Sequence, residues 1–119
     1  MKKRIYLAAP YSHPDKKIRE WRVEQVNRKA ADLMMQGYLV FSPLSHSKEI
    51  EKYCKADPCD HDFWIEQCLW ILSGCDEFHV LCLPGWEDSK GVKEEDKRAD
   101  IMGLKFVYHD WDIRQEVVV

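Results

Sequence analysis

Residues 77–103 read EFHVLCLPGWEDSKGVKEEDKRADIMG, and they contain signals for both a strand and a helix. The apolar run Glu77–Leu83 predicts a buried strand. Pro84 and Gly85 break the run, and the charged segment Ser89–Gly103 then predicts a helix. A strand that leads through a short loop into a helix is typical of a parallel α/β sheet.

The predicted helix carries one residue that its charge pattern does not explain. At about 100° per residue, one face of the helix carries Val92, Glu95, Ala99 and Met102. Glu95 therefore interrupts an apolar stripe. Two interpretations stand side by side: a partly buried glutamate paired with an arginine or a backbone donor, or a carboxylate near the amino end of the helix that acts as a nucleophile or beside an anionic ligand.

The preceding segments repeat the same unit. The short apolar run Arg4–Ala9 ends at Pro10 and predicts a buried strand. Lys16–Gln36 has amphipathic helical spacing, and Tyr38–Phe41 predicts the next strand. A strand, crossover helix and strand in this order close right-handed into a parallel sheet.

The rest of the chain is expected to contain fewer regular elements. Residues 42–60 are interpreted as irregular, with a short helix around Lys48–Lys55. Phe63–Leu72 predicts a helix and Lys105–Tyr108 a fourth strand. The apolar end of the tail, Val117–Val119, is interpreted as a contact with a partner.

These elements predict an α/β domain over residues 1–119, an open, mainly parallel sheet of Rossmann-like or flavodoxin-like type with helices on both faces. Ligands bind such sheets beyond the carboxyl ends of the strands. The loops expected at that edge are Pro10–His13, the segment from Ser42 to His46, and Trp86–Gly91. We therefore expect three loops to meet at one crevice.

Composition limits the kinds of ligand that the protein is expected to bind and the cell compartment in which it is expected to work. The formal net charge is −3, from 18 basic and 21 acidic residues that are mixed along the chain, so no basic footprint for a nucleic-acid polymer or an anionic membrane is expected. The apolar run after Met1 is too short for secretion, and none is long enough to span a bilayer. Five cysteines, an odd number, favour a reduced, cytoplasmic protein.

The sequence does not indicate a metal or a cofactor. Cys54, Cys59 and His61 lie close in sequence but lack a fourth ligand at a suitable spacing. P-loop, GxGxxG and GxSxG motifs are absent. The chemically informative residues are the inward carboxylate of Glu95 and nearby tyrosines and other aromatic residues. A carboxylate nucleophile beside stacking aromatic rings is suited to breaking a bond at an anomeric carbon.

Three segments carry a resemblance to a known family. They are IYLAAPYS at residues 5–12, VFSPLSH at 40–46 and CDEFHVLCLPGWEDSKGVKEEDKRADIMGLKFV at 75–107. In this order and spacing they resemble the nucleoside 2-deoxyribosyltransferase family, which includes 2'-deoxynucleoside 5'-monophosphate N-glycosidases. The closest likeness is to uncharacterised small relatives that share the GWExSxG segment.

The resemblance implies roles for individual residues. Glu95 stands at the position of the nucleophile that attacks the anomeric carbon of a 2-deoxyribose, and Tyr6 at that of the residue that orients it. Ser89 matches the serine that contacts phosphate in the nucleotide hydrolases, where transferases often have aspartate. Further substrate contacts are expected from Ala8, Ala9, Pro10, Tyr11, Ser12 and Gly91.

The chain also departs from the family pattern. Cys68 stands where the family usually has an aspartate that protonates or holds the base, and Pro10 where hydrolase-like members tend to have a serine. Asp62 is taken as the replacement acid, although Asp60 or His46 remain alternatives and Asp60 is more simply explained as a helix cap.

Other side chains keep two interpretations each. Trp86 either stacks on a base or packs against its own loop, and Arg19 and Arg22 either reach a phosphate or decorate their helix. His46, in a crevice loop, is expected in the site, whereas His79, in a strand, is expected to be a packed histidine.

The function expected from the sequence is cleavage of the N-glycosidic bond of a 2'-deoxynucleoside 5'-monophosphate or deoxynucleoside, with water or a second base as acceptor. The alternative is a catalytically lapsed nucleotide-binding or sensing module on the same fold. By resemblance, we also expect a homodimer or larger homo-oligomer, because relatives commonly complete their sites with a neighbouring subunit.

Overall fold

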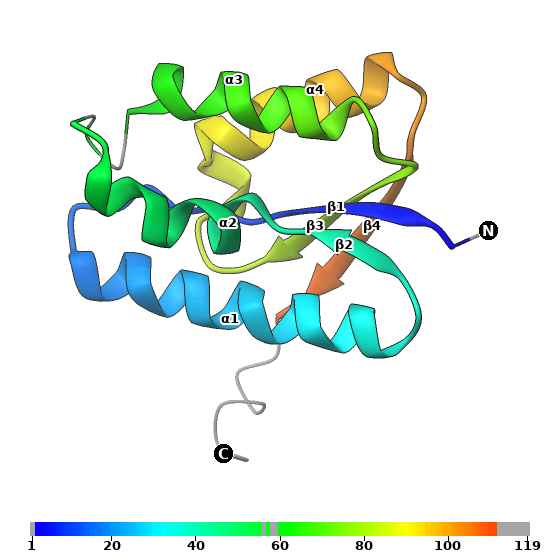
Figure 1. Ribbon diagram of the computed structural model, residues 1–119, viewed down its shortest axis with the longest axis horizontal. Coiled ribbons are helices and arrows are strands. Elements are labelled where there is room, and N and C mark those ends of the chain that lie inside the picture. Colours follow the sequence, from blue (N-terminus) through cyan, green and yellow to red (C-terminus); the bar gives the residue numbers. More distant parts are fainter. Residues whose placement is uncertain (1, 56, 58–59, 112–119) are drawn as a thin grey trace.

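The centre of the molecule is a sheet of four parallel strands in the order β2-β1-β3-β4 (Figure 1). The computed structural model describes residues 2–55, 57 and 60–111 of the chain. The strands are β1 Arg4–Ala8, β2 Leu39–Phe41, β3 Glu77–Cys82 and β4 Lys105–Asp110. Each predicted strand forms, and the parallel pairing confirms the expected α/β fold class.

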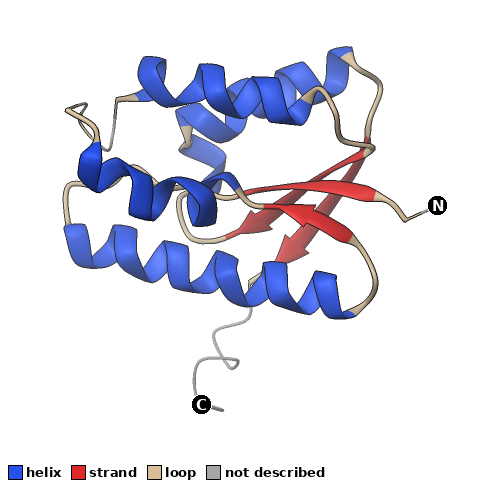
Figure 2. Ribbon diagram, in the orientation of Figure 1, coloured by secondary structure: helices blue, strands red, loops and turns tan. Residues whose placement is uncertain are grey.

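Helices cover both faces of the sheet (Figures 1 and 2). Helix α1, Lys16–Met35, packs on one face, while α3, His61–Leu72, and α4, Lys90–Ile101, lie side by side on the other. Helix α2, Pro43–Ile50, follows β2 and contacts both α1 and β1. Within the described residues, no helix is long and apolar enough to cross a membrane.

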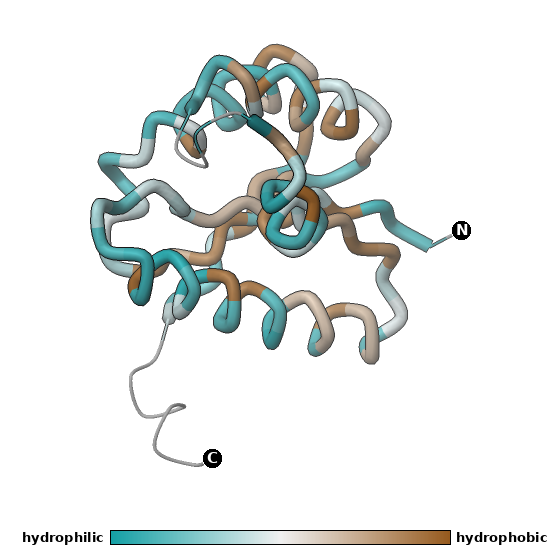
Figure 3. Tube along the Cα trace, turned by 60° about the vertical axis from the view of Figure 1, so that its left-hand side comes forward, coloured by the Kyte–Doolittle hydropathy of each residue, from teal (hydrophilic) through white to brown (hydrophobic). Residues whose placement is uncertain are grey.

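The core is split into two layers by the alternation of side chains along the strands. On β1, Tyr6 and Ala8 pack against α3 and α4, whereas Leu7 packs toward α1. Figure 3 shows hydrophobic residues through the middle of the molecule and a mixture of hydrophilic and hydrophobic residues along the helices. The sheet therefore fixes which side chains can approach α4.

Local signals set the limits of α1. The Asp15 side chain caps its amino end by accepting a hydrogen bond from the Lys17 amide at 2.9 Å. Gln36 ends the helix, and Gly37 follows with φ of 101°, a conformation that glycine adopts without strain. The predicted helix is thus confirmed to within one residue at its end.

The interpretation of residues 42–60 as irregular, with a helix only around Lys48–Lys55, was wrong. Helix α2 begins at Pro43, and the short 3-10 helix η1, Glu51–Tyr53, continues it. Proline is compatible with the first helical turn because the amide it lacks has no intrahelical acceptor there. The Ser42 hydroxyl caps this turn by accepting from the Ser45 amide at 3.4 Å.

A buried histidine lies on the α1 side of the sheet. His79 is 4% exposed and contacts Glu77 Oε1 through Nε2 at 2.9 Å and His109 through Nδ1 at 2.8 Å. This confirms the expectation of a packed histidine. The predicted partner contact at Val117–Val119 and the residue Cys59 lie outside the described residues.

Candidate active site

A cavity suited to a ligand lies at the edge of the sheet where the strand order reverses. From β1 the chain leads through α1 to β2 on one side, whereas β3 on the other side leads through α4 to β4. The loops that follow β1 and β3 therefore diverge, and such a switch point is where open α/β sheets bind ligands. A cavity of about 690 Å³ occupies this position, within the range of small-molecule sites.

Five segments supply the walls of this cavity. They are the loop after β1, α1 through Arg22, helix α2 with η1, α3 from its start to Cys68, and the segment from Gly85 into the first turns of α4. The expected meeting of three loops is thus found, with the second loop replaced by a helix. The side chains from these segments are brought together from distant parts of the sequence.

Glu95 lies in the wall supplied by α4. The buried residues of this helix are Val92, Glu95 and Ala99, which confirms the helical face predicted from spacing. Glu95 is 5% exposed, and burial raises the pKa of its carboxyl from the ordinary 4.5 to about 7, although its hydrogen bond from Tyr6 acts in the opposite direction. At neutral pH this carboxyl is near the midpoint of its titration.

Tyr6 contacts Glu95 directly. Its hydroxyl donates a hydrogen bond to Glu95 Oε2, and its ring is fully buried between Phe41 and Phe78, with centroids 6.1 and 6.0 Å away. Burial, and after it the charge of Glu95, raise the pKa of Tyr6. The phenol therefore stays a proton donor and fixes one carboxylate oxygen.

Cys68 lies beside this pair, on α3, and lines the cavity. Burial, followed by the nearby Glu95 charge, raises the pKa of its thiol to about 11. The side chain at this position is therefore a neutral thiol at neutral pH. The immediate neighbours of Glu95 thus include two un-ionised hydrogen-bonding groups, Tyr6 and Cys68.

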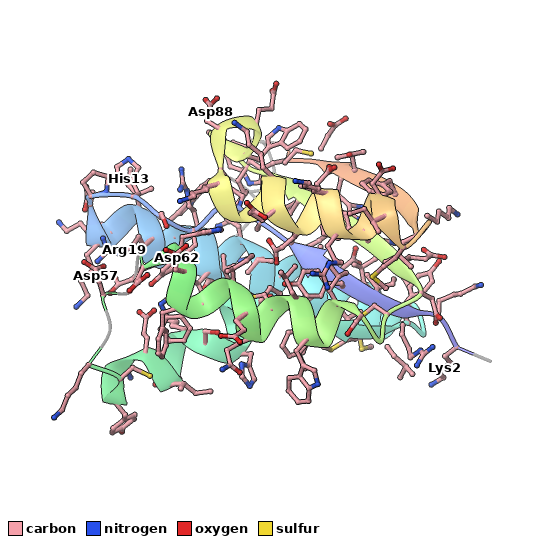
Figure 4. All side chains as sticks on the ribbon, turned by 90° about the horizontal axis from the view of Figure 1, so that it is seen from above. Lys2, His13, Arg19, Asp57, Asp62 and Asp88 are labelled. Carbon is pink, nitrogen blue, oxygen red and sulfur yellow. The ribbon has the colours of Figure 1, made fainter. Side chains whose placement is uncertain are left out.

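The first turn of α3 carries the carboxylate that the sequence proposed as an acid. Asp62 lines the cavity, and Figure 4 shows it at the end of α3 that faces the same side of the molecule as His13 and Asp88. Asp60 also lines the cavity, and its side chain caps α3 by accepting from the Phe63 amide at 3.2 Å. The helix-cap interpretation of Asp60 is confirmed.

The amino end of α4 forms another part of the wall. The Ser89 side chain caps the helix by accepting from the Val92 amide at 3.3 Å, and both Ser89 and Gly91 line the cavity. The free amides of a first helical turn attract anions. Lys90, between them, lines the cavity too and adds a positive charge.

The structure brings most of the remaining expected substrate contacts to the cavity, but not all. The lining residues from the loop after β1 are Ala9, Pro10, Tyr11 and Ser12. Ala8 is fully buried within the core and does not line the cavity.

Two aromatic side chains expected in the site lie elsewhere. The ring of Trp86 packs on Tyr108 of β4, with centroids 5.6 Å apart, whereas its alternative interpretation expected packing against its own loop. The ring of His46 packs on Phe41 at 5.4 Å. Neither is among the residues that line the cavity, because α2 and the turn at 86–88 direct them toward the core.

Sequence reasoning missed the wall formed by α2 and η1. Glu51 lines the cavity and accepts a hydrogen bond from the Tyr11 hydroxyl, at 2.8 and 3.0 Å from its two oxygens. Burial and the Glu51 carboxylate raise the pKa of Tyr11. The signal that was available is Ser42 followed by Pro43, a helix start of the cap-and-proline type.

The two arginines of α1 also differ in position. Arg19 donates to the His13 carbonyl, whereas Arg22 is buried and lines the cavity. Among the residues that the structure describes, no cluster of three or more His, Cys, Asp or Glu side chains has a geometry that holds a metal ion. The side chains that line the cavity include carboxylates, hydroxyls, cations and the Cys68 thiol.

The chain was compared with protein families and with curated proteins. A family model described as "Domain of unknown function (DUF1937)" matches residues 3–110. No curated protein matches the chain.

Among solved structures, the chain is similar to a 2-deoxyribosyltransferase from the psychrotolerant bacterium Bacillus psychrosaccharolyticus. The TM-score is 0.57 at 20% sequence identity, and the match covers 90% of this chain and 72% of that chain. The parallel sheet flanked by helices matches the nucleoside deoxyribosyltransferase fold.

Proposed function

We propose that this chain, which belongs to the DUF1937 family, cleaves the N-glycosidic bond of a 2'-deoxynucleoside 5'-monophosphate or a deoxynucleoside through Glu95. The observation that carries the proposal is the hydrogen bond from the buried Tyr6 hydroxyl to the buried Glu95 carboxylate in the cavity wall. An oriented, buried carboxylate is suited to attack at an anomeric carbon. The structurally similar protein is described as a biocatalyst for nucleoside synthesis, which supports the same chemistry.

The proposed reaction has two displacements. In the first, a Glu95 oxygen forms a bond to the anomeric carbon while the bond from that carbon to the base nitrogen breaks, and the base leaves with the electron pair and takes up a proton. In the second, water or another base attacks the same carbon and releases the Glu95 carboxylate. Two displacements on one carbon retain its configuration.

Tyr6 holds Oε2 of Glu95 and leaves Oε1 for the attack. Its hydrogen bond favours the charged carboxylate and so partly offsets the effect of burial on the pKa. Asp62 is the proposed acid for the leaving base, since the thiol of Cys68, with a pKa of about 11, is a weak acid at neutral pH.

The monophosphate is favoured as substrate by the amino end of α4. Because Ser89 Oγ accepts from the Val92 amide, its own hydrogen is free for a phosphate oxygen. The first-turn amides near Gly91 and the charge of Lys90 act on the same anion. A nucleoside would leave this part of the cavity unfilled.

The second candidate function is nucleotide binding without turnover. It is favoured by the neutral Cys68 beside Glu95 and by a Glu95 pKa of about 7, which leaves about half of the nucleophile protonated at neutral pH. Both candidates share the expectation of one domain in a cytoplasmic homo-oligomer, and light scattering of the purified protein tests the assembly.

Free-base release from a panel of deoxynucleosides and their 5'-monophosphates, followed by liquid chromatography, tests the proposal. Base release by wild type but not by Glu95→Gln is expected, and exchange with an added second base would identify a transferase. No release, together with thermal stabilisation by one of the same compounds, would favour the binding module. No release and no stabilisation would contradict both candidates.

A further inference from the structure

Arg22 occupies a place where an apolar residue would be expected. It lies on the inward face of α1 beside Val23 and Val26, and it is 8% exposed. Another arginine of the same helix, Arg28, is exposed and pairs with Glu24 at 3.2 Å. The two residues have the same chemistry but different surroundings, so the position of Arg22 requires a separate explanation.

The hydrogen bonds of Arg22 join two loops. Its Nη1 donates to the Ser12 carbonyl at 3.0 Å, in the loop after β1, and its Nη2 donates to the Pro84 carbonyl at 3.1 Å, in the loop after β3. These are the two loops that diverge at the switch point, and Arg22 itself lines the cavity between them. One planar guanidinium thus connects both sides of the crevice.

Gly85 shows how closely the second loop approaches this side chain. A Cβ atom added at Gly85 would lie 3.0 Å from Arg22 Nη2, and Gly85 has φ of 93°. The loop therefore turns with its backbone directly against the guanidinium. A side chain at this position would push the two apart.

Stability alone does not account for a buried arginine here. Arg22 Nε is buried and has no hydrogen-bond partner among the described residues. A buried donor without a partner is unfavourable, and an apolar side chain of similar volume is often tolerated equally well in such a position. What an apolar side chain cannot do is donate to both loop carbonyls in a fixed geometry.

We infer that Arg22 is a positioning residue that holds the Ser12 and Pro84 loops at the separation that the ligand requires. This inference rests on the proposed function, because the loops it joins carry the proposed substrate contacts. It assigns Arg22 to the spacing of the loops and not to a direct contact with phosphate. A nucleoside and its monophosphate should therefore depend on Arg22 to a similar degree.

The first test compares Arg22→Met with Arg28→Met, a matched change on the same helix. Binding is measured by calorimetry for one deoxynucleoside and its 5'-monophosphate. Arg22→Met is expected to raise both dissociation constants about tenfold or more, since small misplacements of binding groups have effects of this size, whereas Arg28→Met leaves both unchanged. A loss confined to the monophosphate would overturn the inference, because a direct charge contact would then explain it.

Arg22→Lys separates charge from geometry. Lysine keeps the positive charge but concentrates its donors on one nitrogen, so it cannot span two carbonyls as the guanidinium does. A loss similar to that of Arg22→Met is expected for both ligands. Full recovery of binding by lysine would overturn the inference.

The second test approaches the same contact from the loop. Gly85→Ala and Gly37→Ala both place alanine at positive φ, but the Cβ at Gly37 meets no atom within 4 Å. Gly85→Ala is expected to weaken binding of both ligands by about tenfold beyond any effect of Gly37→Ala. In the Arg22→Met background most of this extra loss should disappear, and fully additive effects would overturn the inference.

Amide hydrogen exchange tests the inference without any ligand. Arg22→Met is expected to speed exchange in residues 11–13 and 85–86 relative to Arg28→Met, because the link between the loops is gone. Unchanged exchange would overturn the inference. If wild type binds and converts none of the compounds, the proposed function fails while the exchange result still decides the role of Arg22.

Discussion

Replacement of Glu95 by glutamine should abolish turnover and at the same time stabilise the protein at alkaline pH. The two effects have one origin, the burial of a carboxylate that is 5% exposed. Glutamine has nearly the same shape and still accepts the hydrogen bond from Tyr6, but it neither ionises nor attacks carbon. We expect turnover to fall at least about a thousandfold while ligand affinity is kept.

The size of the stability effect follows from the pKa. Burial raises the pKa of Glu95 from 4.5 to about 7 in the folded protein, whereas the unfolded chain keeps the ordinary value. Below pH 4.5 both states are protonated and the wild type has no penalty. As the pH rises from 4.5 to 7 the unfolded state loses its proton first, so stability falls by about 3 kcal/mol, at about 1.4 kcal/mol for each pKa unit.

The assay is urea unfolding of wild type and Glu95→Gln at pH 5 and pH 8. The difference in unfolding free energy between the two proteins should increase in favour of the variant by about 2–3 kcal/mol between these pH values. Glu94→Gln, an exposed change on the same helix, is the control and should follow the wild type. If Glu95→Gln also follows the wild type across this range, the carboxyl is not held protonated by burial and the argument fails.

Three further predictions concern other groups. Tyr6→Phe removes a hydrogen bond that lowers the pKa of Glu95. In the profile of kcat/KM against pH, the rising limb is expected near pH 7 for wild type and should move to higher pH in the variant. An unchanged limb would argue against the orienting role of Tyr6. Ser89→Asp should keep the cap of α4 and the stability of the protein, whereas Ser89→Ala should lower the free energy of unfolding in urea by about 1 kcal/mol. Both variants should bind the monophosphate much more weakly but the nucleoside nearly as well as wild type. An equal loss of affinity for both ligands would contradict a phosphate contact. Burial, with Lys29 acting in the same direction, lowers the pKa of His109 from 6.5 to about 4. Protonation therefore favours the unfolded state, and the stability of the protein should fall as the pH drops from about 6.5 to 4. The melting temperature of His109→Gln should fall less over that range than that of wild type, and an equal fall would exclude His109 as the source of the effect.

Much of the fold is recoverable from the sequence because its signals are local. Apolar runs that end at Pro10 and Pro84 mark strands, and the spacing around Glu95 marks a buried helical face. The start of helix α2 was missed because residues 42–47 were interpreted as irregular, although Pro43 is compatible with a first helical turn. The wall that α2 contributes to the cavity was missed with it.

The aromatic and basic residues show where local reasoning ends. Trp86 and His46 lie near the crevice in sequence, yet their rings pack against Tyr108 and Phe41. Arg22 has a helical position that fits either a surface or a cavity residue. Only the packing of α1 on the sheet decides between them, since the direction of one side chain depends on neighbours far away in sequence.

The alternation of strands and helices and the inward position of Glu95 follow from the sequence, because each depends on the periodicity of residues close together in the chain. Which groups meet depends on how the elements pack against one another. Tyr6 reaches Glu95 across 89 positions and Arg22 reaches Pro84 across 62, because parallel pairing sets β1 beside β3 and brings the loops at their carboxyl ends together. The raised pKa of Glu95 is likewise a tertiary property, since a carboxylate loses its water only when the sheet and α3 close over it.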